Sequence, residues 1–155
     1  MRMKNLLQKQ VYLSHNAFMA SGMLMLSMFF YSSALTAGTT MFNSLPPDTA
    51  SLEQYQWHSR PVVIFAPSKK DADYVRQIVM LEQSKADLAD RDIIVLSDTS
   101  PAASGQLRSQ FKPDGFEVVL VGKDGGVKIR QKTPLTSEDL LATIDRMPMR
   151  KANLR

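Results

Sequence analysis

The sequence predicts an α/β domain with one mixed β-sheet, whose elements follow in the order β-α-β-α-β-β-α. Two apolar runs, "VVIFA" at residues 62–66 and "DIIVLSD" at residues 92–98, are typical of strands that are buried on both faces. A helical pattern separates them, which predicts a right-handed βαβ unit with parallel strands. Further along, "FEVVLV" and "VKIRQ" flank "KDGG", an arrangement typical of an antiparallel hairpin. Parallel and antiparallel strands together would make the sheet mixed.

The helix between the two buried strands is expected from about Lys69 to Asp90. Pro67 ends the preceding strand, because proline cannot donate a backbone hydrogen bond. Ser68 and Asp71 then form an S-x-x-D pattern, in which Ser68 is the expected N-cap. The side chains expected near the buried face of this helix are Tyr74, Val75, Ile78, Leu81 and Leu88.

Shorter elements complete the predicted fold. A short helix is expected near residues 104–111, and a closing helix in "TPLTSEDLLATIDRM" with Thr136 as its N-cap. Ser51 and Gln54 resemble a capping box, which predicts another short helix before the first buried strand. Trp57, the single tryptophan, is expected to anchor that segment to the core.

Residues 1–37 have the pattern of an export signal that precedes the domain as a signal helix. The first sixteen residues carry three basic side chains and no acidic one, the next 21 carry no charge, and small residues end the run. This pattern predicts a cleaved signal peptide. The alternative is an uncleaved anchor, because 21 residues just reach the roughly 20 needed to span a bilayer. Either way the basic start predicts a periplasmic domain, free or anchored to the inner membrane and facing the periplasm.

The remaining segments and the overall charge are less informative. Residues 38–50 show no periodicity and are expected to form a linker, and residues 151–155 a solvated basic tail, which leaves the domain at 51–150. Removal of residues 1–37 lowers the net charge from +4 to +1, so the charge gives no argument for nucleic acid binding. No membrane contact is expected beyond an uncleaved N-terminal segment.

The chain contains no cysteine. This excludes thiol chemistry, cysteine-ligated zinc and iron–sulfur clusters. It also excludes disulfides, although an exported domain would occupy a compartment that permits them. The hydrophobic core alone must therefore stabilise the fold.

Four stretches of the chain are specific enough to compare with known families, namely "LEQYQWHSRPVVIFAPS", "LADRDIIVL", "DGFEVVLVGKDGGVKIR" and "LLATIDRMPMR". Together they resemble a bacterial family of exported domains of unknown function, DUF4174. The resemblance covers about residues 51–150 and implies a thioredoxin-like fold with a distant likeness to peroxiredoxins. It also implies a relationship to domains of secreted matrix proteins, some of which bear sushi repeats.

The thiol positions of these redox folds are occupied by other residues. A C-x-x-C motif would fall on Lys70 and Asp73. Counted from Pro67, a peroxiredoxin-type P-x-x-x-T-x-x-C would place Asp71 in the threonine position and Tyr74 in the cysteine position. The chain alone therefore cannot act as a thiol–disulfide oxidoreductase or a thiol peroxidase.

The junction between the first buried strand and its helix is the candidate binding region. Arg60, Lys69 and Lys70 flank this junction, and backbone N–H groups at a helix N-terminus favour anions. A small anion or carboxylate pocket is one interpretation, and solvated lysines are the other. The candidate binding residues are Arg60, Ser68, Lys69, Lys70, Asp71, Asp73 and Tyr74.

Other chemistry finds less support. Asp71, Asp73 and Asp98 could approach one another at the strand ends, but no loop has the spacing of a calcium site, so no metal is expected. Ser68 lacks the G-x-S-x-G context of a serine nucleophile. No catalytic residue is assigned, and no cofactor is implied. The alternative is a hydrolase-like enzyme of a non-thiol class that uses aspartate, Tyr74 or His58.

The sequence thus predicts a cysteine-free, non-catalytic binding or interaction module in a bacterial cell envelope. Its expected partner is an unknown envelope protein or a small anionic ligand.

Overall fold

A computed structural model describes residues 40–153, so the predicted signal helix lies outside the described residues. No helix within 40–153 is long and apolar enough to cross a membrane. The helices and strands of this part are, in chain order, β1 (Phe42–Ser44), the 3₁₀ helix η1 (Glu53–Tyr55), β2 (Arg60–Phe65), α1 (Ala72–Gln83), α2 (Lys85–Ala89), β3 (Ile93–Asp98), the 3₁₀ helix η2 (Pro101–Ala103), α3 (Gln106–Phe111), β4 (Glu117–Val121), β5 (Val127–Gln131), α4 (Ser137–Asp145) and α5 (Pro148–Asn153).

Five strands form one mixed sheet in the order β1-β3-β2-β4-β5. The strands β1, β3 and β2 are parallel, whereas β4 pairs antiparallel with β2 and β5 pairs antiparallel with β4. The register places Val62 opposite Val95 on one side and Leu120 on the other. The predicted mixed α/β sheet is therefore confirmed, including the βαβ unit and the hairpin.

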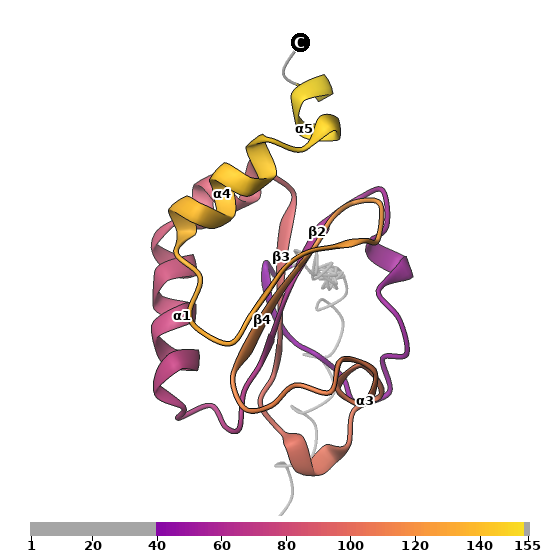
Figure 1. The fold of residues 1–155 in the computed structure, drawn as a ribbon, viewed down its shortest axis with the longest axis vertical. Coiled ribbons are helices and arrows are strands. Elements are labelled where there is room, and N and C mark those ends of the chain that lie inside the picture. Colours follow the sequence, from indigo (N-terminus) through magenta and orange to yellow (C-terminus); the bar gives the residue numbers. More distant parts are fainter. Residues whose placement is uncertain (1–39, 154–155) are drawn as a thin grey trace, which may run out of the picture. The chain divides into compact units, whose positions relative to one another are not determined.

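Helices cover both faces of the sheet, with α1 and α4 on one face and α3 on the other (Figure 1). Successive side chains of β2 point to opposite faces. Val62 packs in a cluster with Leu81 of α1 and Leu140 of α4, while Val63 packs in a second cluster with Leu107 of α3. This two-sided burial explains why β2 and β3 read as continuous apolar runs.

The linker predicted at residues 38–50 is wrong in part, because it contains β1. Phe42 lies opposite Val95, and the backbone N–H of Leu45 donates to the carbonyl of Ser97 at 2.8 Å. A strand of three residues is too short to show a period of two in the sequence.

The single helix expected between β2 and β3 is two helices, and its N-cap is Asp71 rather than Ser68. The Asp71 carboxylate accepts the backbone N–H of Tyr74 at 3.0 Å. The Ser68 hydroxyl instead accepts the backbone N–H of Lys70 at 3.2 Å, within a turn that precedes the helix. Both residue types are good caps, so the sequence pattern could not distinguish them. Ser84 separates α1 from α2.

The buried face of α1 also differs from the prediction. Val75 is 47% exposed, whereas Gln77 is fully buried. The side-chain Nε2 of Gln77 donates to the backbone carbonyl of Leu135 at 2.9 Å, and its Oε1 accepts the backbone N–H of Leu135 at 2.6 Å. A polar residue at an inward position thus fixes the segment before α4. In that helix the predicted cap is confirmed, since the Thr136 hydroxyl accepts the backbone N–H of Asp139 at 3.1 Å.

A further prediction, at Trp57, is wrong, and the end of the domain is more ordered than expected. The Trp57 side chain is 63% exposed and does not anchor to the core. The chain is helical in α5 as far as Asn153, where a tail was expected from residue 151. Arg150, in the same helix, has a side chain that is only 12% exposed.

Candidate functional site

Six of the seven candidate residues lie together between the end of β2 and the first turn of α1, which we call the β2–α1 corner (residues 67–74). Most of their polar groups have local structural roles. Asp71 caps α1, Asp73 lies 3.9 Å from Arg76, and Tyr74 packs partly buried against the core. The lysines are exposed. The negative Asp71 carboxylate already occupies the helix N-terminus at which an anion would bind, which disfavours an anion at this corner.

Asp98 lies at the carboxyl end of β3 but is held by Arg108. The Arg108 Nε donates to the Asp98 carboxylate at 2.8 Å, and its Nη2 donates to the carbonyls of Asp98 and Ala66 at 2.9 and 3.1 Å. The guanidinium also lies 5.4 Å from the ring centroid of Phe65. Within residues 40–153, no three acidic or histidine side chains gather closely enough to hold a metal ion.

Arg60, the seventh candidate, lies at the opposite end of β2 and is not brought to the corner. It begins a strand of six residues, which separates it from the corner by roughly 17–20 Å at about 3.3 Å per residue. His58 lies at the same end, exposed, with its Nδ1 2.8 Å from the carbonyl of Gln56. The structure therefore does not bring His58 together with Asp71 or Tyr74.

The Arg60 side chain is buried and incompletely paired. It is 1% exposed. Its Nη1 donates to the carbonyl of Arg91 at 2.7 Å and lies 3.6 Å from the Asp92 carboxylate. Its Nε and Nη2 have no hydrogen-bond partner among the described residues. Burial lowers the pKa of Arg60, the Asp92 charge opposes this, and the nearby Arg150 charge adds to it.

Arg60 belongs to a set of ion pairs that we call the charge network. Arg91 binds the Asp145 carboxylate through two hydrogen bonds of 2.9 and 2.8 Å. This contact is the main reason that the pKa of Asp145 is lowered and that of Arg91 is raised. The members of the charge network are Arg60, Arg91, Lys123, Arg150, Asp90, Asp92 and Asp145.

The network ties five segments together at this end of the sheet, namely the start of β2, the loop between α2 and β3, the turn between β4 and β5, the end of α4, and α5. Arg150 of α5 donates to the carboxylate of Asp90 and, at 2.9 Å, to its backbone carbonyl. Lys123, in the turn between β4 and β5, lies 2.7 Å from the Asp92 carboxylate. The helix α5 is thus held beside the sheet end opposite the β2–α1 corner (Figure 1).

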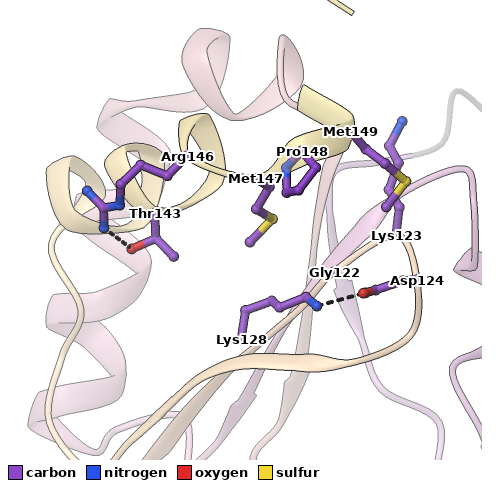
Figure 2. Close-up of a pocket in the computed structure, with 9 residues that line it drawn as sticks. All are labelled: Gly122, Lys123, Asp124, Lys128, Thr143, Arg146, Met147, Pro148 and Met149. Carbon is purple, nitrogen blue, oxygen red and sulfur yellow. Dashed lines mark hydrogen bonds and ion pairs between the residues drawn. The ribbon is translucent and has the colours of Figure 1, made fainter. Parts of the chain in front are cut away.

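A cleft of about 530 Å³ opens next to this network, between the β4–β5 turn and the junction of α4 and α5 (Figure 2). Its apolar lining comes from the helix side, and Met147 points toward the strand that carries Lys128. Lys128 lies 2.6 Å from the Asp124 carboxylate. The lining residues are Gly122, Lys123, Asp124, Lys128, Thr143, Arg146, Met147, Pro148 and Met149.

The sequence offered a signal for this cleft that motif reasoning passed over. Its walls are "GKDGG", which was interpreted as a hairpin turn, and "RMPM", at the end of the predicted closing helix. Both belong to the stretches that carry the family resemblance. No spacing rule connects the two segments, because only the folded chain brings residues 122–128 and 143–149 together.

The loop before β2 supports the same turn. The backbone N–H of Trp57 donates to the carbonyl of Lys123 at 2.7 Å, and the side-chain amide of Gln56 donates to the carbonyl of Asp124 at 3.2 Å. Trp57 adopts a φ of +66°, which is uncommon for a bulky residue. The backbone of Trp57 is therefore bonded to the turn that forms one wall of the cleft, while its side chain is exposed.

Residues 51–153 match the family model described as "Domain of unknown function (DUF4174)". The chain belongs to the DUF4174 family. The match covers the β2–α1 corner, the charge network and the cleft. No curated protein shows a significant sequence match to the chain.

Solved structures confirm that this DUF4174 domain has a thioredoxin-like fold. Chloroplastic thioredoxin z superposes with a TM-score of 0.51 at 17% identity, covering 68% of this chain and 92% of its own. The reduced 2-Cys peroxiredoxin of Plasmodium vivax gives 0.50 at 13%, covering 65% and 84%. Thioredoxin peroxidase I of Plasmodium yoelii gives 0.50 at 12%, covering 65% and 79%. Identities this low establish the fold alone.

Proposed function

We propose that this DUF4174 domain is an exported, non-catalytic binding module of a bacterial cell envelope, and that it binds its ligand in the cleft between the β4–β5 turn and the α4–α5 junction. The observation that carries the proposal is the cleft itself. A volume of about 530 Å³, apolar lining and a few charged groups are the features of small-molecule sites, which span about 300–1,000 Å³.

Within residues 40–153, the two carboxylates whose pKa values are displaced are not suited to acid–base catalysis, which supports a non-catalytic role. Groups that catalyse proton transfer have a pKa near the working pH. The carboxylates with displaced pKa values in residues 40–153 are Asp124 and Asp145, and in both the pKa is lowered by a hydrogen bond from a cation, Lys128 or Arg91. They remain ionised at neutral pH and can neither donate a proton nor accept one readily.

The absence of cysteine gives the second support. The corner after β2 is where thiol-dependent members of this fold class place the reactive sulfur, and it contains none here. The purified protein should therefore fail to reduce insulin disulfides and to consume peroxide. Turnover in either assay, at a rate above that of a mock preparation, would refute the non-catalytic proposal.

Export is proposed from residues 1–37 alone. N-terminal sequencing of the protein recovered from the periplasm should begin after the apolar run if the signal is cleaved. An intact N-terminus in the membrane fraction would favour the anchored form. Recovery from the cytoplasm would contradict export.

Binding in the cleft is tested with a variant that fills it. Small molecules that copurify with the protein from its host are released by denaturation and identified by mass spectrometry. Met149→Trp should abolish their enrichment, because the larger ring would occupy the cleft. Val79→Trp, at an exposed position on α1, is the matched control and should retain it. Equal enrichment by both variants would exclude the cleft. Ligand binding at the β2–α1 corner stays a prediction.

A further inference from the structure

We propose that the cleft binds a small amphiphile with one carboxylate on an apolar chain. This rests on the proposed function, because it takes the cleft to be the binding site and names the ligand class. Two independent features carry it, namely the apolar lining and the incomplete pairing of the charge network behind the cleft wall.

The apolar part of the ligand would contact the helix side of the cleft. Met147, Pro148 and Met149 lie together there, and Met147 extends into the space between the junction and the hairpin (Figure 2). Methionine side chains are unbranched and polarisable, so they adapt to flexible apolar chains. The methylene groups of Lys128 add apolar surface on the facing strand.

Positive charge exceeds negative charge in the cleft lining. Lys123, Lys128 and Arg146 line it, against the single carboxylate of Asp124. Lys128 is paired with Asp124. Arg146 donates to the Thr143 hydroxyl at 3.2 Å and has no carboxylate within ion-pair distance among the described residues. The lining therefore complements an anionic group.

The charge network explains where a ligand carboxylate would act. Lys123 lies on the cleft wall, and its ammonium group is 2.7 Å from the Asp92 carboxylate. The same carboxylate is the one within ion-pair distance of buried Arg60, at 3.6 Å, and does not hydrogen-bond to it. The Asp92 carboxylate is thus shared between two cations, and it lies closer to Lys123 than to Arg60. Asp87 also faces the network, but on the side of Arg91.

A ligand carboxylate that paired with Lys123 would supply the second negative charge that these two cations lack. It would draw the ammonium group toward the cleft and leave Asp92 to approach Arg60, whose Nε and Nη2 are unpaired. A ligand with a single negative charge is enough to pair with Lys123. A second one would meet the exposed carboxylates of Asp92 and Asp124. This favours a monocarboxylate over a phosphate or a dicarboxylate.

The test is calorimetric titration of the protein, as purified from its host, with decanoate below its micelle concentration. Decanoate should bind saturably with one site, and decanol at least about tenfold more weakly, because the loss of a charged contact of about 1.4 kcal/mol corresponds to that factor. Lys123→Met, which keeps the methylene chain, should weaken decanoate binding by about tenfold or more. Arg76→Ala, on the exposed side of α1, is the charge-matched control and should leave the affinity unchanged.

Asp92→Asn distinguishes a ligand contact of Lys123 from a purely structural role of Lys123. Asparagine suits the left-handed backbone of this position, where φ is +55°. The substitution removes the charge that competes for Lys123, so decanoate should bind several-fold more tightly than to the wild type. Binding to an apolar segment elsewhere in the chain would respond to neither Lys123→Met nor Asp92→Asn.

The remaining outcomes separate the ligand class from the site. Equal binding of decanol and decanoate would overturn the carboxylate, as would weaker binding to Asp92→Asn. Binding of a peptide with a free apolar C-terminus, in the absence of decanoate binding, would overturn the small-molecule ligand in favour of a protein partner. If Met149→Trp abolishes enrichment of some other compound and decanoate does not bind, the cleft stands as the site and the ligand class fails.

Discussion

Replacement of Arg60 by methionine should change the free energy of unfolding by no more than about 1 kcal/mol, although the side chain is a fully buried cation. The structure shows both the interactions that the substitution removes and the unpaired groups that it removes. The substitution removes the hydrogen bond from Arg60 to the carbonyl of Arg91, worth about 1.5–3 kcal/mol for a charged donor, and leaves that carbonyl unpaired at a cost of about 1–3 kcal/mol. It also removes two buried nitrogen donors without partners, Nε and Nη2, each of which costs about 1–3 kcal/mol in the wild type. The losses and gains therefore nearly cancel.

The matched variant is Arg91→Met, at a neighbouring, partly buried arginine whose three guanidinium nitrogens all have hydrogen-bond partners. Arg91 makes two hydrogen bonds to Asp145 and one to the carbonyl of Asp87. Asp145 is partly solvated, which weakens the ion pair, so we expect a loss of about 2 kcal/mol rather than the 3–5 kcal/mol of a fully buried pair. Urea unfolding followed by far-ultraviolet circular dichroism measures both. A loss above about 2 kcal/mol for Arg60→Met, with a smaller one for Arg91→Met, would refute the incomplete pairing of Arg60.

Three other predictions concern stability. Gln77→Met should lower the free energy of unfolding by about 2–4 kcal/mol in urea, because the buried backbone N–H and carbonyl of Leu135 lose their partners. The control Gln83→Met, at the exposed end of α1, should lower it by less than about 0.5 kcal/mol. Similar losses for the two variants would mean that water replaces the buried hydrogen bonds. Trp57→Asn should leave stability within about 0.5 kcal/mol of the wild type, because the ring is exposed and asparagine tolerates positive φ; a larger loss would show that the ring does contribute to packing. The hydrogen bond from Arg91 lowers the pKa of Asp145 below its ordinary 3.8, so its stabilisation is present above that pH and lost as the pH falls through the lower folded value. The stability difference between wild type and Asp145→Asn should therefore shrink between pH 5 and pH 2, and a difference independent of pH would contradict the ion pair.

The sheet was predictable from sequence because its signals are local. The apolar runs of β2 and β3, the hairpin turn and the Thr136 cap each identify one element within about ten residues. Their order, together with the family resemblance, was enough for the mixed thioredoxin-like arrangement. The predictions that were wrong concern features that depend on tertiary contacts. The strand β1 exists through its pairing with β3, and Gln77 is buried because a distant peptide satisfies its amide.

The candidate site was only partly predictable for a related reason. Proximity in sequence placed Arg60 at the β2–α1 corner, but an extended strand separates the two. The cleft needs two segments about twenty residues apart, and the charge network draws on five. Nothing in the spacing of Lys123, Met147 or Arg150 signals their meeting. A sequence pattern identifies sites built on one motif, such as a C-x-x-C pair, and this chain has none.

The two ends of the sheet differ in how completely their charges are satisfied. At the β2–α1 corner the helix N-terminus is capped by Asp71, and the buried carboxylate of Asp98 is bound by Arg108 through several contacts. An added anion would there meet existing negative charge. At the opposite end a buried arginine shares its carboxylate with Lys123, which reaches a cleft. A loss of thiol chemistry at the corner would leave this second end unaffected, because the two are separated by the length of β2. The fold can therefore retain a binding function without the site for which its architecture is known.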